Sequence, residues 1–124
     1  MLKEIAVEGC QLIIPEAGPG YTIEIVSDPE EFVKVCDKKP YAKEMKVTIT
    51  NVTTGGILDG NGHNTGDVVI QATAISGKVN HKPCMRQGDK VQDVQLTGTT
   101  LGNTAYDWVT VEIMDAGQSY VKCE

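Results

Sequence analysis

The chain has 124 residues, a length that predicts a single domain over 1–124. It is 40% hydrophobic but only 5% aromatic, so Val, Ile, Leu and Thr must fill its core, and these residues favour strands. The formal net charge is −6 and no basic stretch occurs, which argues against a nucleic-acid partner because phosphate binding needs a positive face.

The pattern of apolar residues predicts strands along most of the chain. In chain order, strands are expected at 22–26, 46–50, 68–72, 91–96 and 109–113, and several alternate with period two. The best helix candidate is 27–34, where a cap residue precedes a proline in the first turn. The fold class is therefore expected to be all-β.

The glycine-rich segment 53–67 is expected to be a mobile loop. Its Asp59-Gly60-Asn61-Gly62-His63 run resembles the opening of a calcium-binding loop, but Ile70 stands where a bidentate Glu would be needed. No Gly-Lys-Ser/Thr follows, so the segment does not predict a phosphate cradle either.

An internal repeat organises the sequence. Lys34, Lys78 and Lys122 are spaced by 44 residues (78 − 34 and 122 − 78), and Ile25, Val69 and Ile113 keep the same step. The third copy stops at Glu124, but residues 2–7 resemble the strand that it lacks. The chain is therefore interpreted as three units of about 44 residues, the first split between the termini. Three such units suggest pseudo-threefold symmetry, in which the first and last strands meet and cover an open edge.

Residues 75–90 contain a Lys-Val pair, small polar residues, Lys-Pro with a following hydrophobic position, and then Gly-Asp; Thr- and Gly-rich turns come next. In these phrases the chain resembles the PAAR-like tip proteins of contractile injection systems. The resemblance covers 66–124, including a similar ending at 109–124, and reaches the other residues only through the repeat. A strict Pro-Ala-Ala-Arg element does not occur.

The resemblance implies a small, conical, pseudo-threefold β domain. Such a domain would sit as a monomer on a homotrimeric spike, in a 1:3 ratio, and sharpen it for mechanical piercing of a target membrane. The machine would be a phage tail, a bacteriocin or a type VI-like secretion apparatus. The alternative is another β module of a phage or virion, such as a tail adaptor or decoration protein.

Several members of that family hold a metal near the apex through His and Cys. Here His63, His81 and Cys84 are the candidate ligands for one zinc or iron ion, with Cys10 and Cys36 as further partners. His81 and Cys84 form a single His-x-x-Cys step. The alternative is that the cysteines are small buried apolar residues and the histidines lie on the surface.

Catalysis by Cys84 with His81 or His63 is the third hypothesis, but no orienting group for such a pair can be named from the sequence. We therefore expect no enzyme activity and no small-molecule substrate. The longest early apolar run, Leu12-Ile13-Ile14, is too short for a signal peptide. Synthesis in the cytoplasm is expected, followed by assembly into a virion, tailocin or secretion apparatus, and the four cysteines are expected to be thiols or metal ligands.

Overall fold

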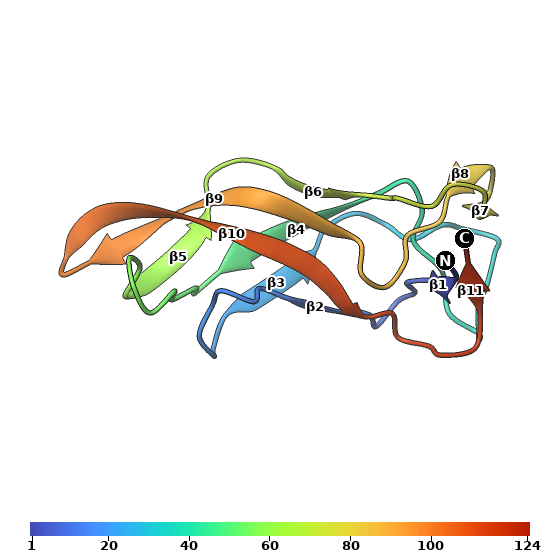
Figure 1. Ribbon diagram of the computed structural model, residues 1–124, viewed down its shortest axis with the longest axis horizontal. Helices are drawn as coiled ribbons and strands as arrows, with labels where there is room; N and C mark the ends of the chain where they lie inside the picture. The colour runs from blue at the N-terminus through green and yellow to red at the C-terminus, as the bar shows by residue number, and fades with distance from the viewer.

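The computed structural model describes residues 1–124 and consists of strands and turns without a helix (Figure 1). The strands are β1 (Lys3–Glu4), β2 (Gln11–Ile13), β3 (Thr22–Ile25), β4 (Glu44–Thr50), β5 (Gly60–Asn64), β6 (Val68–Gln71), β7 (Lys78–Val79), β8 (Lys82–Pro83), β9 (Lys90–Thr100), β10 (Asn103–Asp115) and β11 (Lys122–Cys123). The predicted all-β class is confirmed.

The five predicted strands correspond to β3, β4, β6, β9 and β10, and the last two extend well beyond their predicted bounds. The predicted helix at 27–34 is wrong. Phe32 has a positive φ of 66°, and the Glu30 N–H donates to Pro40 O at 2.8 Å rather than to a helical partner. Backbone groups of this segment are thus used in contacts with distant parts of the chain.

Two antiparallel sheets make up most of the molecule. One has the strand order β2-β10-β9-β5 and the other has the order β3-β4-β6. The β9–β10 hairpin is long and ends, together with β5, at the left of Figure 1, which we call the hairpin end. The short strands β1, β7, β8 and β11 and both chain termini lie at the right, which we call the terminal end.

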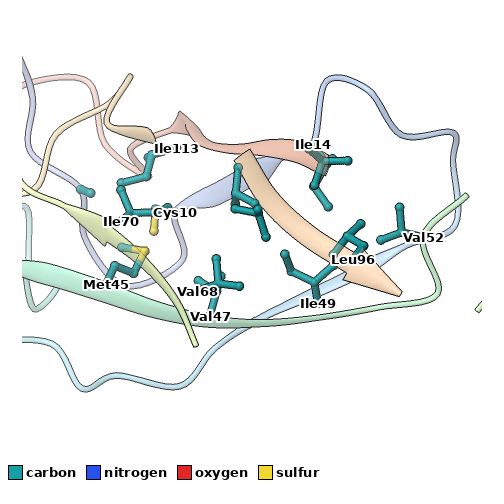
Figure 2. Packing of buried hydrophobic residues seen from close by; sticks show 14 of the residues in the cluster. Cys10, Ile14, Met45, Val47, Ile49, Val52, Val68, Ile70, Leu96 and Ile113 are labelled. Atoms are coloured by element: carbon teal, nitrogen blue, oxygen red, sulfur yellow. The ribbon is translucent and has the colours of Figure 1, made fainter. Parts of the chain in front are cut away.

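The main core lies between the two sheets (Figure 2). Along β4 the buried residues Met45, Val47 and Ile49 alternate with exposed ones, as period-two patterning predicts. They pack in one cluster with apolar residues of β6, β9 and β10, among them Leu96 and Ile113. Each fully buried side chain of this kind contributes about 1.5–3 kcal/mol, so these strands carry much of the stability.

Strand β5 was missed in the sequence because it contains little except Gly, Asn and His. It pairs with β9, and a side chain at Gly98 would prevent this approach. A Cβ on Gly98 of β9 would lie 2.8 Å from Gly60 O and 3.1 Å from the Gly62 Cα. The segment expected to be a loop therefore contributes an edge strand that depends on close backbone contact.

We predict that Gly98→Ala destabilises the protein by about 1–3 kcal/mol, because the added methyl group must push β5 away from β9. The matched control is Gly66→Ala, since a Cβ on Gly66 meets no atom within 4 Å and Gly66 has no positive φ. Urea unfolding of both variants measures the difference. Equal stability of the two variants would contradict this account of β5.

Candidate functional site at the terminal end

Three short segments far apart in the chain meet at the terminal end. They are 5–7, 40–42 and 84–86, and each forms an antiparallel bridge with both of the others. The bridges are Ile5↔Arg86, Val7↔Pro40 and Ala42↔Cys84. In each case the last residue of one segment pairs with the first residue of the next, so the three segments close on themselves. We call this arrangement the three-segment ring.

Hydrogen bonds between the middle residues follow the same cyclic order. The Ala6 N–H donates to Met85 O at 2.9 Å, the Met85 N–H to Tyr41 O at 3.1 Å, and the Tyr41 N–H to Ala6 O at 2.9 Å. Each of the three residues therefore donates once and accepts once within the set. This closure satisfies backbone groups that would otherwise be buried without partners.

A second set of hydrogen bonds flanks the first and runs around the ring in the opposite donor-to-acceptor direction. It consists of Glu8 N–H to Lys39 O, Lys43 N–H to Pro83 O and Gln87 N–H to Glu4 O, at 2.9, 2.7 and 2.9 Å. Six backbone hydrogen bonds thus link the three segments, and any one segment is held by both of its neighbours.

Each ring segment follows a miniature hairpin. In the first, Val35 bridges Lys38 through the turn residues Cys36 and Asp37, which have φ of 53° and 64°. In the second, β7 and β8 are joined by Asn80 and His81, with φ of 50° and 67°. Two consecutive residues with positive φ are typical of a type I′ turn. The third pair, β11 with β1, has no turn because its strands come from the two ends of the chain.

These contacts bear on the predicted repeat. Tyr41 and Met85 are 44 residues apart (85 − 41), and Lys34, Lys78 and Lys122 all lie at or beside the three strand pairs. Superposition of whole 44-residue units, and a conical shape, stay predictions. The strands that follow the three ring segments differ in length, with three residues in β2, seven in β4 and eleven in β9.

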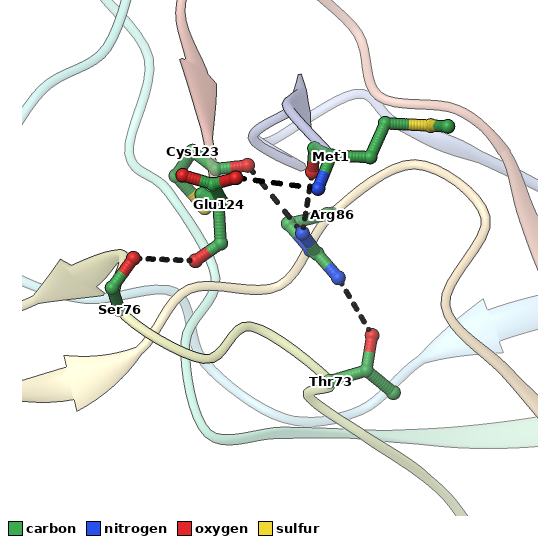
Figure 3. Close-up of polar contacts among 6 residues, drawn as sticks. All are labelled: Met1, Thr73, Ser76, Arg86, Cys123 and Glu124. Atoms are coloured by element: carbon green, nitrogen blue, oxygen red, sulfur yellow. Dashed lines mark hydrogen bonds and ion pairs between the residues drawn. The ribbon is translucent and has the colours of Figure 1, made fainter.

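Arg86 connects the ring to both chain ends (Figure 3). Its Nη1 donates to Met1 O at 3.2 Å and to Cys123 O at 3.5 Å, and its Nη2 donates to Thr73 Oγ1 at 3.0 Å. Arg86 is buried, and so is Asp89, whose carboxylate accepts the Arg86 backbone N–H and the Thr73 hydroxyl. The guanidinium therefore ties both ends of the chain to the ring.

Three consecutive backbone N–H groups bind the last residue, Glu124. The N–H groups of Ile75, Ser76 and Gly77 donate to the backbone oxygen of Glu124 at 3.2, 2.9 and 2.7 Å, and Ser76 Oγ adds a bond of 3.3 Å. Successive N–H groups that point at one oxygen form a nest. The Met1 amino group also lies 3.4 Å from the Glu124 carboxylate.

The four cysteines divide into two classes. Cys84 and Cys123 form a disulfide between residues 39 apart in the sequence, whereas Cys10 and Cys36 are free. The expectation that all four are thiols or metal ligands is therefore wrong for the bonded pair, because sequence spacing does not reveal that β11 lies against the ring. Burial raises the pKa of the Cys10 thiol to about 11, so this thiol stays protonated at neutral pH.

The candidate metal ligands are not brought together. His63 lies on β5 towards the hairpin end, with Nδ1 2.9 Å from Asn61 O, while His81 lies in the β7–β8 turn at the terminal end (Figure 1). Cys84 is bonded to Cys123, and no group of three or more His, Cys, Asp or Glu side chains is placed to hold a metal ion.

This arrangement does not fit a zinc or iron site made of His63, His81 and Cys84. Metal binding stays a prediction, which elemental analysis of the purified protein tests. About one equivalent per chain would require a different ligand set or a reduced, rearranged form of the protein.

Three large apolar side chains are almost fully exposed beside the strand pairs of the terminal end. Phe32, Ile75 and Tyr120 have relative exposures of 102%, 90% and 85%. They are separated by 43 and 45 residues (75 − 32 and 120 − 75), close to the repeat. Phe32 is held in a backbone conformation that a bulky residue rarely adopts. Their exposure and spacing make these three residues candidates for an interaction surface.

Comparison with known proteins adds no identification, since no family model, curated protein or solved structure matches the chain. No helix of the structure is long and apolar enough to cross a bilayer.

We predict that Arg86→Met lowers the free energy of unfolding by about 2–4 kcal/mol, because it removes the charged donor that Met1 O, Cys123 O and Thr73 Oγ1 share. Lys34→Met is the control: Lys34 is exposed and its ammonium group makes no ion pair, so a change within about 0.5 kcal/mol is expected. Thermal and denaturant unfolding measure both variants. A neutral Arg86→Met would show that the terminal strands are held by other contacts.

Proposed function

We propose that this protein is a PAAR-like structural tip, which caps a homotrimeric spike of a contractile tail or secretion machine. The three-segment ring is the observation that carries the proposal. A chain that surrounds an axis with three similar segments can meet three identical subunits with one copy of itself. The sequence resemblance at 66–124 points to the same class of protein independently.

We assign the docking face to the terminal end. Phe32, Ile75 and Tyr120 offer one exposed apolar group for each subunit of a trimer, and the backbone beside them is fixed by the three strand pairs. Interface cores are rich in aromatic and apolar residues and poor in charge. The hairpin end, where the β9–β10 turn projects, would then point away from the spike towards the target membrane (Figure 1).

The proposed role is structural rather than enzymatic. Cys84 is fully buried and bonded to Cys123, so neither His81 nor His63 has a free thiol partner in Cys84. Assembly into the machine would follow synthesis in the cytoplasm, with the protein monomeric until it meets the spike. The second candidate, a tail adaptor or decoration protein, shares the all-β fold but does not require three equivalent contacts.

We predict that co-expression with the trimeric spike of the same machine yields a complex of one chain to three spike subunits. Native mass spectrometry of the complex, and of the free protein, gives both stoichiometries. A stable homotrimer of this chain, or a 3:3 complex, contradicts the capping model and favours the adaptor or decoration reading.

We further predict that Phe32→Asn, Ile75→Asn and Tyr120→Asn each weaken spike binding roughly ten- to a hundredfold, because each removes about 1.5–3 kcal/mol of apolar burial. Leu101→Asn is the matched control, because Leu101 is 91% exposed and also has a positive φ, of 48°, but lies at the hairpin end. Titration of labelled variants with the spike measures the affinities. Loss of binding in Leu101→Asn alone would reverse the assigned orientation.

A further inference from the structure

We infer that the Cys84–Cys123 disulfide is a redox-controlled clasp, which fixes the C-terminal segment 116–124 to the ring only under oxidising conditions. This inference concerns the third strand pair and does not depend on the spike or on the capping role. The third strand pair differs from the two complete hairpins because no turn joins β11 to β1.

The first two hairpins are closed by the chain itself. Val35 and Val79 precede two-residue turns, so the second strand of each hairpin cannot move away from the first. In the third pair, β11 contacts β1 only through Lys3↔Cys123 and Glu4↔Lys122. No peptide bond joins these two strands locally, and two residue pairs make an isolated strand pair only marginally stable.

The disulfide occupies the corresponding position of the third pair. Val35, Val79 and Cys123 are spaced by 44 residues (79 − 35 and 123 − 79) and are similarly buried, with exposures of 8%, 6% and 9%. The two valines pack without a covalent bond. Cys123 instead bonds to Cys84, which is a residue of the ring itself. The covalent link thus takes the place of the turn that closes the other two hairpins.

The remaining contacts of the segment are non-covalent. Cys123 O accepts a buried bond from Arg86 Nη1, Glu124 O accepts the N–H groups of 75–77, and the Ile5 and Val7 N–H groups donate to Val121 O and Ala116 O. The ion pairs Met1–Glu124 and Lys122–Glu4, at 3.4 and 3.9 Å, lie at exposed or half-exposed side chains and contribute little. The hydrogen bond from Gln118 Nε2 to Ile5 O, at 2.9 Å, is partly buried. Without the disulfide, detachment of the segment breaks only non-covalent bonds and gains the conformational freedom of nine residues.

The chemistry is thiol–disulfide exchange with a small-molecule disulfide such as oxidised glutathione. Cys84 is fully buried within the ring, whereas Cys123 lies on the strand that can detach. The Cys123 thiolate attacks the oxidant to form a mixed disulfide, and one glutathione thiolate leaves. The Cys84 thiolate then displaces the second glutathione. The protein loses two protons and two electrons, and the oxidant takes up both electrons as two thiols.

The redox state of the surrounding compartment determines whether the disulfide is open or closed. A reducing cytoplasm keeps both thiols free and the segment mobile, whereas an oxidising exterior closes the clasp. The ring does not open with it, because none of the hydrogen bonds among Ala6, Tyr41 and Met85 involves residues 116–124.

The test compares the full chain equilibrated with oxidised glutathione and with dithiothreitol. Alkylation under denaturing conditions should count two thiols, those of Cys10 and Cys36, in the oxidised form and four in the reduced form. By hydrogen exchange, the amides of β11 and of 75–77, which bond to Glu124 O, should exchange at least about tenfold faster after reduction. The amides of β4, in the main core, should change less than about twofold.

Three variants complete the experiment. Cys84→Ala and Cys123→Val should exchange like the reduced protein under both conditions, whereas Cys36→Ser, which removes an exposed free thiol, should keep the full redox response. Four thiols after oxidation would show that the bond does not form and would overturn the inference. Equal exchange at 75–77 and β11 in both redox states would overturn it too, because the bond would then have no effect on the segment. Slower amide exchange in Cys84→Ala and Cys123→Val than in the oxidised protein would also overturn the inference.

Discussion

The cyclic backbone hydrogen bonding of Ala6, Tyr41 and Met85 is the constraint on which the other features depend. It brings the start of the chain into contact with two segments from its middle, so the N-terminal residues cannot leave without opening the ring. Strands that run away from the ring then have their first residues fixed, and the two sheets of the main core are built on these fixed starting points.

The ring also explains why polar contacts gather around the chain ends. A protein with two complete hairpins and one divided between its termini must hold the divided pair by means other than a turn. Arg86, the nest at 75–77 and the Cys84–Cys123 bond all serve this purpose. A buried charge is costly unless it is hydrogen-bonded, and the Arg86 guanidinium donates to Met1 O, Cys123 O and Thr73 Oγ1. The same region provides both the proposed docking face and the proposed redox clasp.

Sequence patterns were informative where one local rule dominates. Alternation of Val, Ile and Thr located β3, β4, β6, β9 and β10. Prediction from the sequence failed where contacts with residues elsewhere in the chain determine the local structure. The capping residues before Pro29 favour a helix, but Pro40 takes the Glu30 N–H. The pairing of β5 with β9 depends on Gly98. The Cys84–Cys123 disulfide depends on the position of β11 beside the ring. Neither feature has a signal in the local sequence.

Native-state hydrogen exchange of the Ala6, Tyr41 and Met85 amides tests the central claim most directly. If the ring closes as described, the three amides are protected together and exchange at one common rate, close to that of global unfolding, because no single segment opens alone. Much faster exchange of Ala6 than of Tyr41 and Met85 would contradict the account. It would mean that the N-terminal segment opens independently and that the chain is not organised around a closed ring.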